Sequence, residues 1–138
     1  MSIVETTSLR PDHPISRVIK GGWQLAGDHG PVDRAAAIAD MEAFLDAGIT
    51  TFDCADIYTG VEEMIGAFRV EYANQRGAEA LAKIKVHTKY VPDLGALATL
   101  SKAEVETAID TAMGRLNMKR LDLVQFHWWN YAVDRQVE

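Results

Sequence analysis

The chain has 138 residues, of which 48% are hydrophobic and 25% charged, and this is enough apolar material for the core of one domain. Its net charge of -6 argues against nucleic acid and anionic membranes as main partners, because both require a basic face. A single cysteine excludes an intrachain disulfide, and the sequence shows neither a signal peptide nor about 18 consecutive apolar residues, so we expect a soluble cytoplasmic protein.

The first third of the chain contains one apolar run and one helical pattern. Residues 1–16 hold two prolines among mixed polar residues and are expected to form an N-terminal arm or loop. The run RVIKGGWQLAG starts at Arg17 and ends in two glycines and a tryptophan. A helix is expected next, with Asp33 as its N-cap and Gly48 at the position of the glycine that follows a helix.

The second apolar run, ITTFD, starts at Ile49 and stops at an aspartate. A loop and a second amphipathic helix are expected after it, and this helix should end near Gly77. Glu62 and Glu63 are expected to favour the start of this helix through its dipole. The segment RGAEALAKIK, residues 76–85, is expected to be a solvated turn that leads into a strand.

Two further runs complete the pattern. KIKVHTKY, from Lys83, alternates in the manner of a strand. A third helix is expected to begin at Ser101, which forms a capping-box pattern with Glu104, and to stop at Asn117. The fourth run, RLDLVQFHWW, starts at Arg120.

Strands that alternate with helices in the order β-α-β-α-β-α-β predict right-handed crossovers and a parallel sheet. The runs begin 32 to 37 residues apart, close to the roughly 31 residues per unit of a (β/α)₈ barrel. A doubly wound sheet is the alternative, but no G-x-G-x-x-G fingerprint follows the first strand. We therefore predict an α/β fold in which residues 17–138 form strands one to four, the N-terminal half of a TIM barrel. Strands five to eight are expected to be missing, which would leave the inward faces open, including Ile49, His87 and Leu123.

Polar residues end three successive strands of this predicted half barrel. Asp53 ends the second, Lys89 the third and His127 the fourth, and these strand ends share the face on which barrel active sites lie. Tyr58 follows in the loop above the second strand. Each residue alone has a structural interpretation, as a cap, a solvated lysine, a core histidine or a packed loop tyrosine. Four such groups on one rim are costly to bury without a use.

The four groups suit proton delivery to an oxygen atom. A nearby ammonium favours the phenolate form of a tyrosine, so Lys89 would make Tyr58 a stronger acid, and Asp53 would hold Lys89 in place. His127 would donate a hydrogen bond to a carbonyl oxygen and orient it.

The segments DCADIY with the following EE and Gly66, HTKY and LDLVQFHWW resemble the aldo-keto reductase family, and GGWQLAG is similar to its first barrel strand. The resemblance runs from about residue 17 to the end of the chain. It implies a catalytic tetrad of Asp53, Tyr58, Lys89 and His127. It also implies cofactor contacts from Gly22, Trp23 and Asp53, and substrate contacts from Trp23 and Trp128. The implied reaction is hydride transfer between NADPH, or less often NADH, and an aldehyde or ketone, with Tyr58 as proton donor and no metal.

Three functions stay open at this point. The chain is an NAD(P)H-dependent oxidoreductase for a small-molecule carbonyl compound, which would require self-association or a complementary C-terminal segment. Alternatively, it is a non-catalytic fragment or interaction module of the same fold. A lyase that uses Lys89 as a Schiff-base nucleophile is the third reading, and pairing with Asp53 disfavours it by keeping the amine protonated. Whether this chain is itself an active enzyme is not decided by the sequence.

Overall fold

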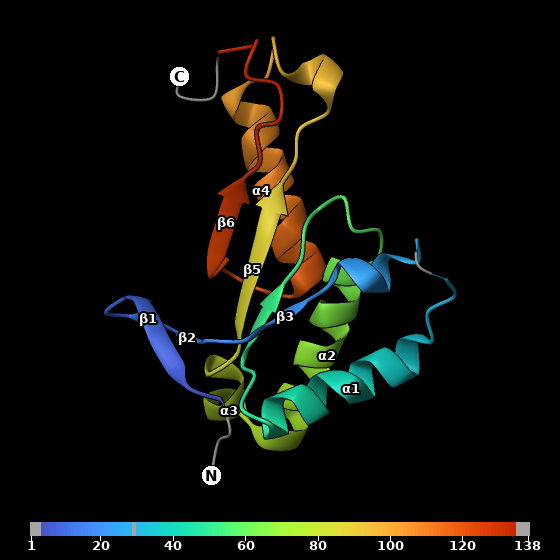
Figure 1. The fold of residues 1–138 in the computed structure, drawn as a ribbon, viewed down its shortest axis with the longest axis vertical. Coiled ribbons are helices and arrows are strands. Elements are labelled where there is room, and N and C mark those ends of the chain that lie inside the picture. The colour runs from blue at the N-terminus through green and yellow to red at the C-terminus, as the bar shows by residue number, and fades with distance from the viewer. Residues whose placement is uncertain (1–3, 29, 135–138) are drawn as a thin grey trace.

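The computed structural model describes residues 4–28 and 30–134 (Figure 1). From the third strand onward, helices and strands follow the predicted alternation. The elements are β1 (Thr6–Arg10), β2 (His13–Ser16), β3 (Ile19–Gly21), the 3-10 turn η1 (Trp23–Ala26), α1 (Arg34–Asp46), β4 (Thr51–Asp53), α2 (Val61–Arg76), α3 (Ala78–Ala82), β5 (Lys85–Tyr90), the 3-10 turn η2 (Leu94–Ala96), α4 (Lys102–Leu116) and β6 (Leu123–Phe126).

Four strands form one parallel sheet in the order β3-β4-β5-β6. Each strand pairs with the next one in the chain and the order never reverses. A doubly wound sheet reverses its strand order, whereas a barrel wall adds strands in sequence. The predicted α/β fold of parallel (β/α) units, the wall of a partial barrel, is confirmed.

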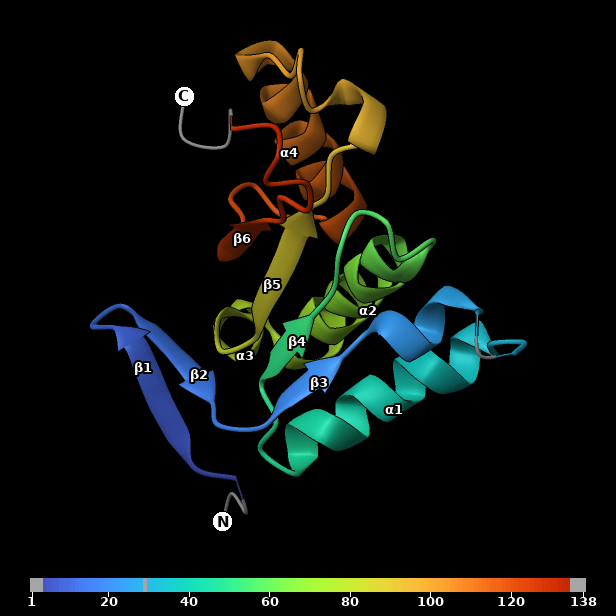
Figure 2. The same ribbon diagram turned by 45° about the horizontal axis from the view of Figure 1, so that its top comes forward.

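The main core lies between this sheet and its helices, which gather along one side of the strands (Figure 2). Phe52 and Val86 are paired in the register of β4 and β5, and both are buried on the helix side. Apolar residues of the helices pack against them, chiefly Met41, Met64, Ile65, Phe68 and Leu116. Because side chains alternate along a strand, Asp53, His87 and Lys89 lie on the opposite face, which would be the inside of a barrel.

Helix ends form where the sequence predicts them. The Asp33 side chain accepts a hydrogen bond from the backbone N–H of Ala36 at 3.1 Å and caps α1. Ser101 and Glu104 form both hydrogen bonds of a capping box at the start of α4. Asn117 ends α4 in the left-handed conformation, with φ of 55°. No helix among the described residues combines the length and apolar character needed to cross a bilayer.

Two segments differ from the expectation. Residues 78–82, expected to be part of a solvated turn, form the short helix α3, because alanine, glutamate and leucine are good helix formers and Leu81 packs against the core. The arm at residues 1–16 is not a loop over its described part. β1 and β2 pair there as an antiparallel hairpin, with Thr6 opposite Ser16.

The hairpin is attached to the inner face of the sheet. The hydroxyl oxygen of Ser16 accepts hydrogen bonds from the backbone N–H groups of Thr50 and Thr51, each at 3.1 Å. His13 and His87 share a hydrogen bond of 2.9 Å between their Nε2 atoms, and their rings stack. His87 is therefore only 5% exposed, and the expectation that it would lie on an open inner face is wrong.

Acidification is expected to destabilise the fold through this histidine pair. Burial lowers the pKa of His87, and His13 lowers it further, while Asp122 and Asp53 act in the opposite direction. As the pH falls below about 6.5, the unfolded chain takes up a proton before the folded chain does, so stability present above that pH is lost below it. The slope should reach at most about 1.4 kcal/mol per pH unit for one proton.

Denaturant unfolding at a series of pH values between about 7.5 and 5.5 measures this slope. Glutamine cannot titrate, so the variant His87→Gln should give a flatter profile in the same range. Equal slopes in the two proteins would assign the acid sensitivity to other groups.

Candidate functional site

Lys89 and Asp53 form an ion pair at the carboxyl ends of β4 and β5. The Lys89 ammonium donates to both carboxylate oxygens of Asp53, at 2.9 and 2.7 Å, and to the backbone carbonyl of Cys54 at 2.8 Å. An ammonium has three N–H donors, and all three directions are used here. The parallel register brings the two side chains to the same edge of the sheet, as predicted from their positions at the strand ends.

Tyr58 lies over this ion pair. Its ring centroid is 5.1 Å from the Lys89 ammonium nitrogen, within the range of a cation–π contact. Two turns hold the loop that carries it, since the N–H of Tyr58 donates to the carbonyl of Ala55 and its own carbonyl accepts from Val61. The structure thus brings three of the four predicted catalytic residues together, Asp53, Lys89 and Tyr58.

His127 follows β6 and is the fourth member of the predicted tetrad. Its backbone N–H donates to the carbonyl of Tyr90 at 2.9 Å, which extends the pairing of β5 with β6 by one residue. The imidazole is exposed and meets the ring of Trp129 edge-on, with centroids 5.9 Å apart. Its contact is therefore with Trp129, and its role toward a carbonyl oxygen stays a prediction.

Gly22 and Trp23 lie where the chain leaves β3. A Cβ atom at Gly22 would come within 2.8 Å of the Asp53 carbonyl oxygen and 2.9 Å of a Val61 methyl group. Glycine therefore lets the turn pack closely against the end of β4, which is a structural reason for the residue. Trp23 begins η1 and is 51% exposed, so a large aromatic surface stands one residue beyond this packed turn.

Trp128 is turned into the loop that follows it. The indole N–H donates to the carbonyls of Asn130 and Val133, the ring meets Phe126 edge-on, and the residue is only 7% exposed. The neighbouring Trp129 is about half exposed and donates its N–H to the carbonyl of Pro92. Substrate contact by Trp128 stays a prediction. In this structure the indole is buried against its own loop and does not offer an exposed surface to a substrate.

The thiol of Cys54, the residue after Asp53, is buried in the core between the sheet and its helices. Burial raises its pKa to about 12, so the side chain stays a neutral thiol at physiological pH. Only its backbone carbonyl takes part in the site, as the acceptor for Lys89.

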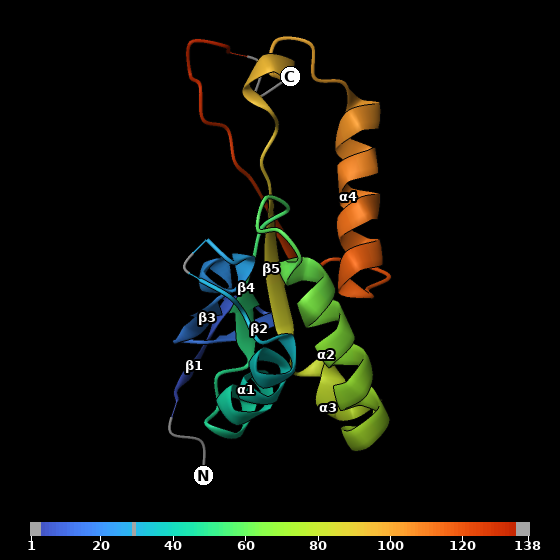
Figure 3. The ribbon, with the colours of Figure 1, turned by 90° about the vertical axis from the view of Figure 1, so that its right-hand side faces the viewer.

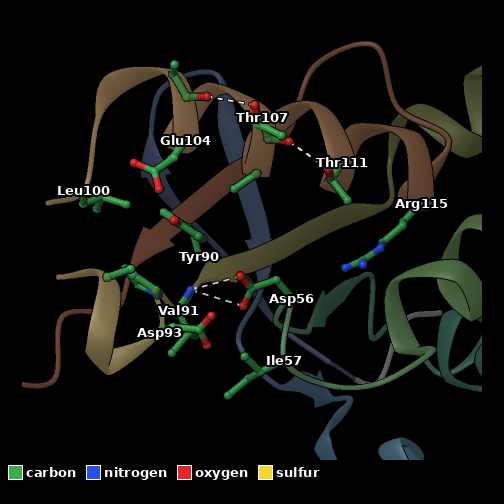
Figure 4. A pocket seen from close by; sticks show the side chains of 14 residues that line it. Asp56, Ile57, Tyr90, Val91, Asp93, Leu100, Glu104, Thr107, Thr111 and Arg115 are labelled. Carbon is green, nitrogen blue, oxygen red and sulfur yellow. Dashed lines mark hydrogen bonds between the residues drawn. The ribbon is translucent and has the colours of Figure 1, made fainter.

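A cavity of about 550 Å³ lies elsewhere. It separates α4 from the end of β5 and the segment after it, and its lining includes Asp56, Tyr90, Glu104 and Arg115 (Figure 4). Figure 3 shows α4 standing beside β5, with its amino-terminal part beyond the end of the strand. None of the predicted site residues lines this cavity.

The contacts of two carboxylates close to Tyr58 in the chain were not predicted from the sequence. Asp56 accepts from the backbone N–H of Val91, and Glu62 accepts from the hydroxyl of Thr88 at 2.6 Å. Glu62 was expected to favour the start of α2 through the helix dipole, and it does lie in the first turn, where it is also only 1% exposed. Its spacing from Ile65, three residues on and buried on the same helix face, is the signal that could have revealed this.

The model of the aldo/keto reductase family matches residues 17–137. The chain belongs to the aldo-keto reductase family. This confirms the resemblance carried by the strand-end motifs.

Similar aldo-keto reductases are longer than this chain. Aldo-keto reductase YhdN of Bacillus subtilis is 28% identical over 116 residues, which cover 82% of this chain and 34% of YhdN. The aldo-keto reductase AKR2E5 of the silkworm Bombyx mori superposes with a TM-score of 0.72 at 23% identity, covering 93% of this chain and 37% of that one. A second AKR2E5 structure, complexed with NADPH, gives a TM-score of 0.70 at 24% identity. The protein PA4992 of Pseudomonas aeruginosa gives 0.69 at 22%, over 89% of this chain and 47% of that one. The chain thus spans about a third to a half of the length of these relatives.

Proposed function

We propose that this aldo-keto reductase chain carries the proton-donating part of an NAD(P)H-dependent oxidoreductase that reduces an aldehyde or ketone. The observation that supports this most is the cluster of Asp53, Lys89 and Tyr58 at the open end of the parallel strands. A phenol supported by an ammonium is suited to acid catalysis at an oxygen. The buried thiol of Cys54 offers no competing nucleophile.

The proposed proton transfer uses these three residues in sequence. Asp53 fixes the Lys89 ammonium, which lies against the Tyr58 ring. Tyr58 gives its phenolic proton to the carbonyl oxygen as that oxygen gains negative charge. The phenolate that results lies next to a fixed positive charge, which stabilises it. His127 is proposed to orient the same oxygen.

The groups at this end of the sheet fit a nicotinamide cofactor. A half-exposed indole, Trp23, stands in the turn beside the end of β4, and Gly22 allows that turn to close against Asp53. These three residues are the proposed cofactor contacts, and Trp23 and Trp128 the proposed substrate contacts. The chemistry expected from bound NADPH, or less often NADH, is hydride donation to the carbonyl carbon. NADPH is bound in the AKR2E5 complex, to which this chain is similar.

The cofactor proposal is tested by titrating the chain with NADPH and following tryptophan fluorescence. We expect saturable quenching that is largely lost in Trp23→Phe, because Trp23 would lie nearest the nicotinamide. Trp129→Phe is the matched control, since that indole is engaged with Pro92 and should leave the quenching intact. A folded wild-type chain that shows no quenching would overturn the proposal for this chain.

The mass of the species that binds NADPH should be measured in the same experiment. The chain spans 34% to 47% of these relatives, so we propose that the complete site needs self-association or a complementary C-terminal segment. Light scattering with and without NADPH distinguishes the two, because self-association doubles the mass of the binding species. The cytoplasm is the proposed location, on the evidence of the single cysteine alone.

One observation favours a second function, that of a non-catalytic fragment or interaction module. The ring of His127 contacts Trp129, and Trp128 is buried in its own loop. Among the described residues, the structure therefore gives no contact of His127 or Trp128 with the Tyr58 ring. The lyase alternative is weaker. All three N–H donors of Lys89 are bound to acceptors, which leaves the amine poorly placed to attack a carbonyl carbon. Borohydride treatment with a carbonyl compound should therefore trap no adduct at Lys89.

A further inference from the structure

The segment that carries Tyr58 does not leave the sheet when β4 ends at Asp53. It continues along β5, since the backbone N–H of Cys54 donates to the carbonyl of His87 at 2.8 Å and that of Asp56 donates to Lys89 at 3.1 Å. Cys54 and Ala55 are completely buried. The tyrosine loop therefore begins from backbone that is already fixed to the strand bearing Lys89.

A carboxylate attaches the loop two residues before Tyr58. Both oxygens of Asp56 lie 3.2 Å from the backbone nitrogen of Val91, which donates to them (Figure 4). Val91 follows the end of β5 and is two residues beyond Lys89. Burial raises the pKa of Asp56, and the Val91 hydrogen bond opposes that rise.

A second carboxylate attaches the loop four residues after Tyr58. Glu62 lies in the first turn of α2 and is buried, and one of its oxygens accepts from the Thr88 hydroxyl at 2.6 Å. The other oxygen accepts from Arg115 at 3.3 Å, so the charge is paired. Thr88 is the residue directly before Lys89, and its side chain points to the helix side of β5 while that of Lys89 points to the other.

We propose that Asp56 and Glu62 are positioning residues that set the Tyr58 ring against the Lys89 ammonium. The two carboxylates, on either side of Tyr58 in the chain, bind Val91 and Thr88, which lie on either side of Lys89. The contact between the Tyr58 ring and Lys89 is then fixed by hydrogen bonds on both sides of Tyr58 in the chain. The inference rests on the proposed role of Tyr58 as proton donor.

Nuclear Overhauser cross-peaks between the Tyr58 ring protons and the Lys89 Hε protons measure this contact in the full chain. Thr88→Val keeps the side-chain shape but removes the hydroxyl that Glu62 binds, and Thr88→Ser keeps the hydroxyl. We expect loss of the cross-peak in Thr88→Val and its retention in Thr88→Ser. Cross-peaks between Phe52 and Phe68, whose ring centroids are 6.0 Å apart, report in each variant that the core is intact.

The Asp56 attachment is tested in the same way. Asp56→Ala removes both acceptors and should lose the cross-peak, whereas Asp56→Asn keeps one acceptor oxygen and should retain it. Asp93→Ala is the matched control, because Asp93 is an exposed carboxylate near the same strand end whose side chain does not cap η2. Asp56 is only partly buried, so this pair of variants decides the question if Thr88→Val does not fold.

The outcomes separate this inference from the proposed function. Survival of the cross-peak in folded Thr88→Val and Asp56→Ala would overturn the positioning role, whatever the NADPH titration shows. A wild-type chain that gives the cross-peak but no NADPH quenching would refute the proposed function and leave the positioning of Tyr58 standing. Loss of the cross-peak in both variants, with retention in both conservative variants, supports the proposal.

Discussion

Gly66→Ala is expected to cost about 3 kcal/mol or more of folding free energy, the upper end of the range for overpacked cores. Gly66 lies in α2 where this helix crosses the end of α4, and a Cβ atom there would fall on the carbonyl oxygen of Arg115. It would also approach the carbonyl carbons of Arg115 and Leu116 to 3.1 Å. These are backbone atoms, so no rotamer change relieves the clash and the two helices must separate.

Domains of this kind are stable by roughly 5–15 kcal/mol in total, so a loss of about 3 kcal/mol removes roughly a fifth to three fifths of the stability. Denaturant unfolding followed by circular dichroism measures the loss. Gly114→Ala is the matched control, since Gly114 is also helical and a Cβ atom there would meet nothing within 4 Å. That variant should gain about 0.5–1 kcal/mol. Similar stabilities for the two variants would contradict the described packing of α2 on α4.

Tyr58→Phe is expected to lower carbonyl reduction by roughly 10²- to 10⁴-fold, the range for loss of a positioned general acid. Only the hydroxyl is removed, and the ring that lies over Lys89 stays in place. Folding and NADPH quenching should therefore be unchanged. The rate is measured from NADPH consumption with an aromatic aldehyde, in whichever assembly of the wild-type chain shows turnover.

Tyr131→Phe serves as the control for this experiment, because Tyr131 is highly exposed and lies in the segment after β6. It should keep the wild-type rate. Full activity in Tyr58→Phe would mean that another group delivers the proton. A loss of NADPH quenching in the same variant would instead give the hydroxyl a binding role.

Local signals allowed much of the fold to be predicted. Asp33, Asn117 and the pair of Ser101 and Glu104 act within four residues of sequence, and all three helix ends form as expected. The pairing of Asp53 with Lys89 could also be predicted, although 36 residues separate them. Parallel strands place their carboxyl ends at one edge, so the position of each residue in its strand carried the information.

The features that were missed depend on contacts between distant segments. Nothing near His13 indicates that it will meet His87, and the polar β1 sequence has no apolar face that would signal a docked hairpin. Glu62 has the sequence position of an ordinary helix-dipole residue, and only the approach of Thr88 and Arg115 makes its burial tolerable. In the same way, no sequence pattern specified that Trp128 would bond to its own loop.

The hairpin also sets an order of events during synthesis. β1 and β2 leave the ribosome before the strands of the parallel sheet, but His87 is 74 residues further along the chain than His13. At 5–20 residues per second, the hairpin waits roughly 4 to 15 s before its partner histidine has been translated. The hydrogen bonds of Ser16 with Thr50 and Thr51 can form once β4 has been translated, whereas the contact between His13 and His87 must wait for β5. Attachment of the hairpin can therefore be completed only after the strand that bears His87 has been made.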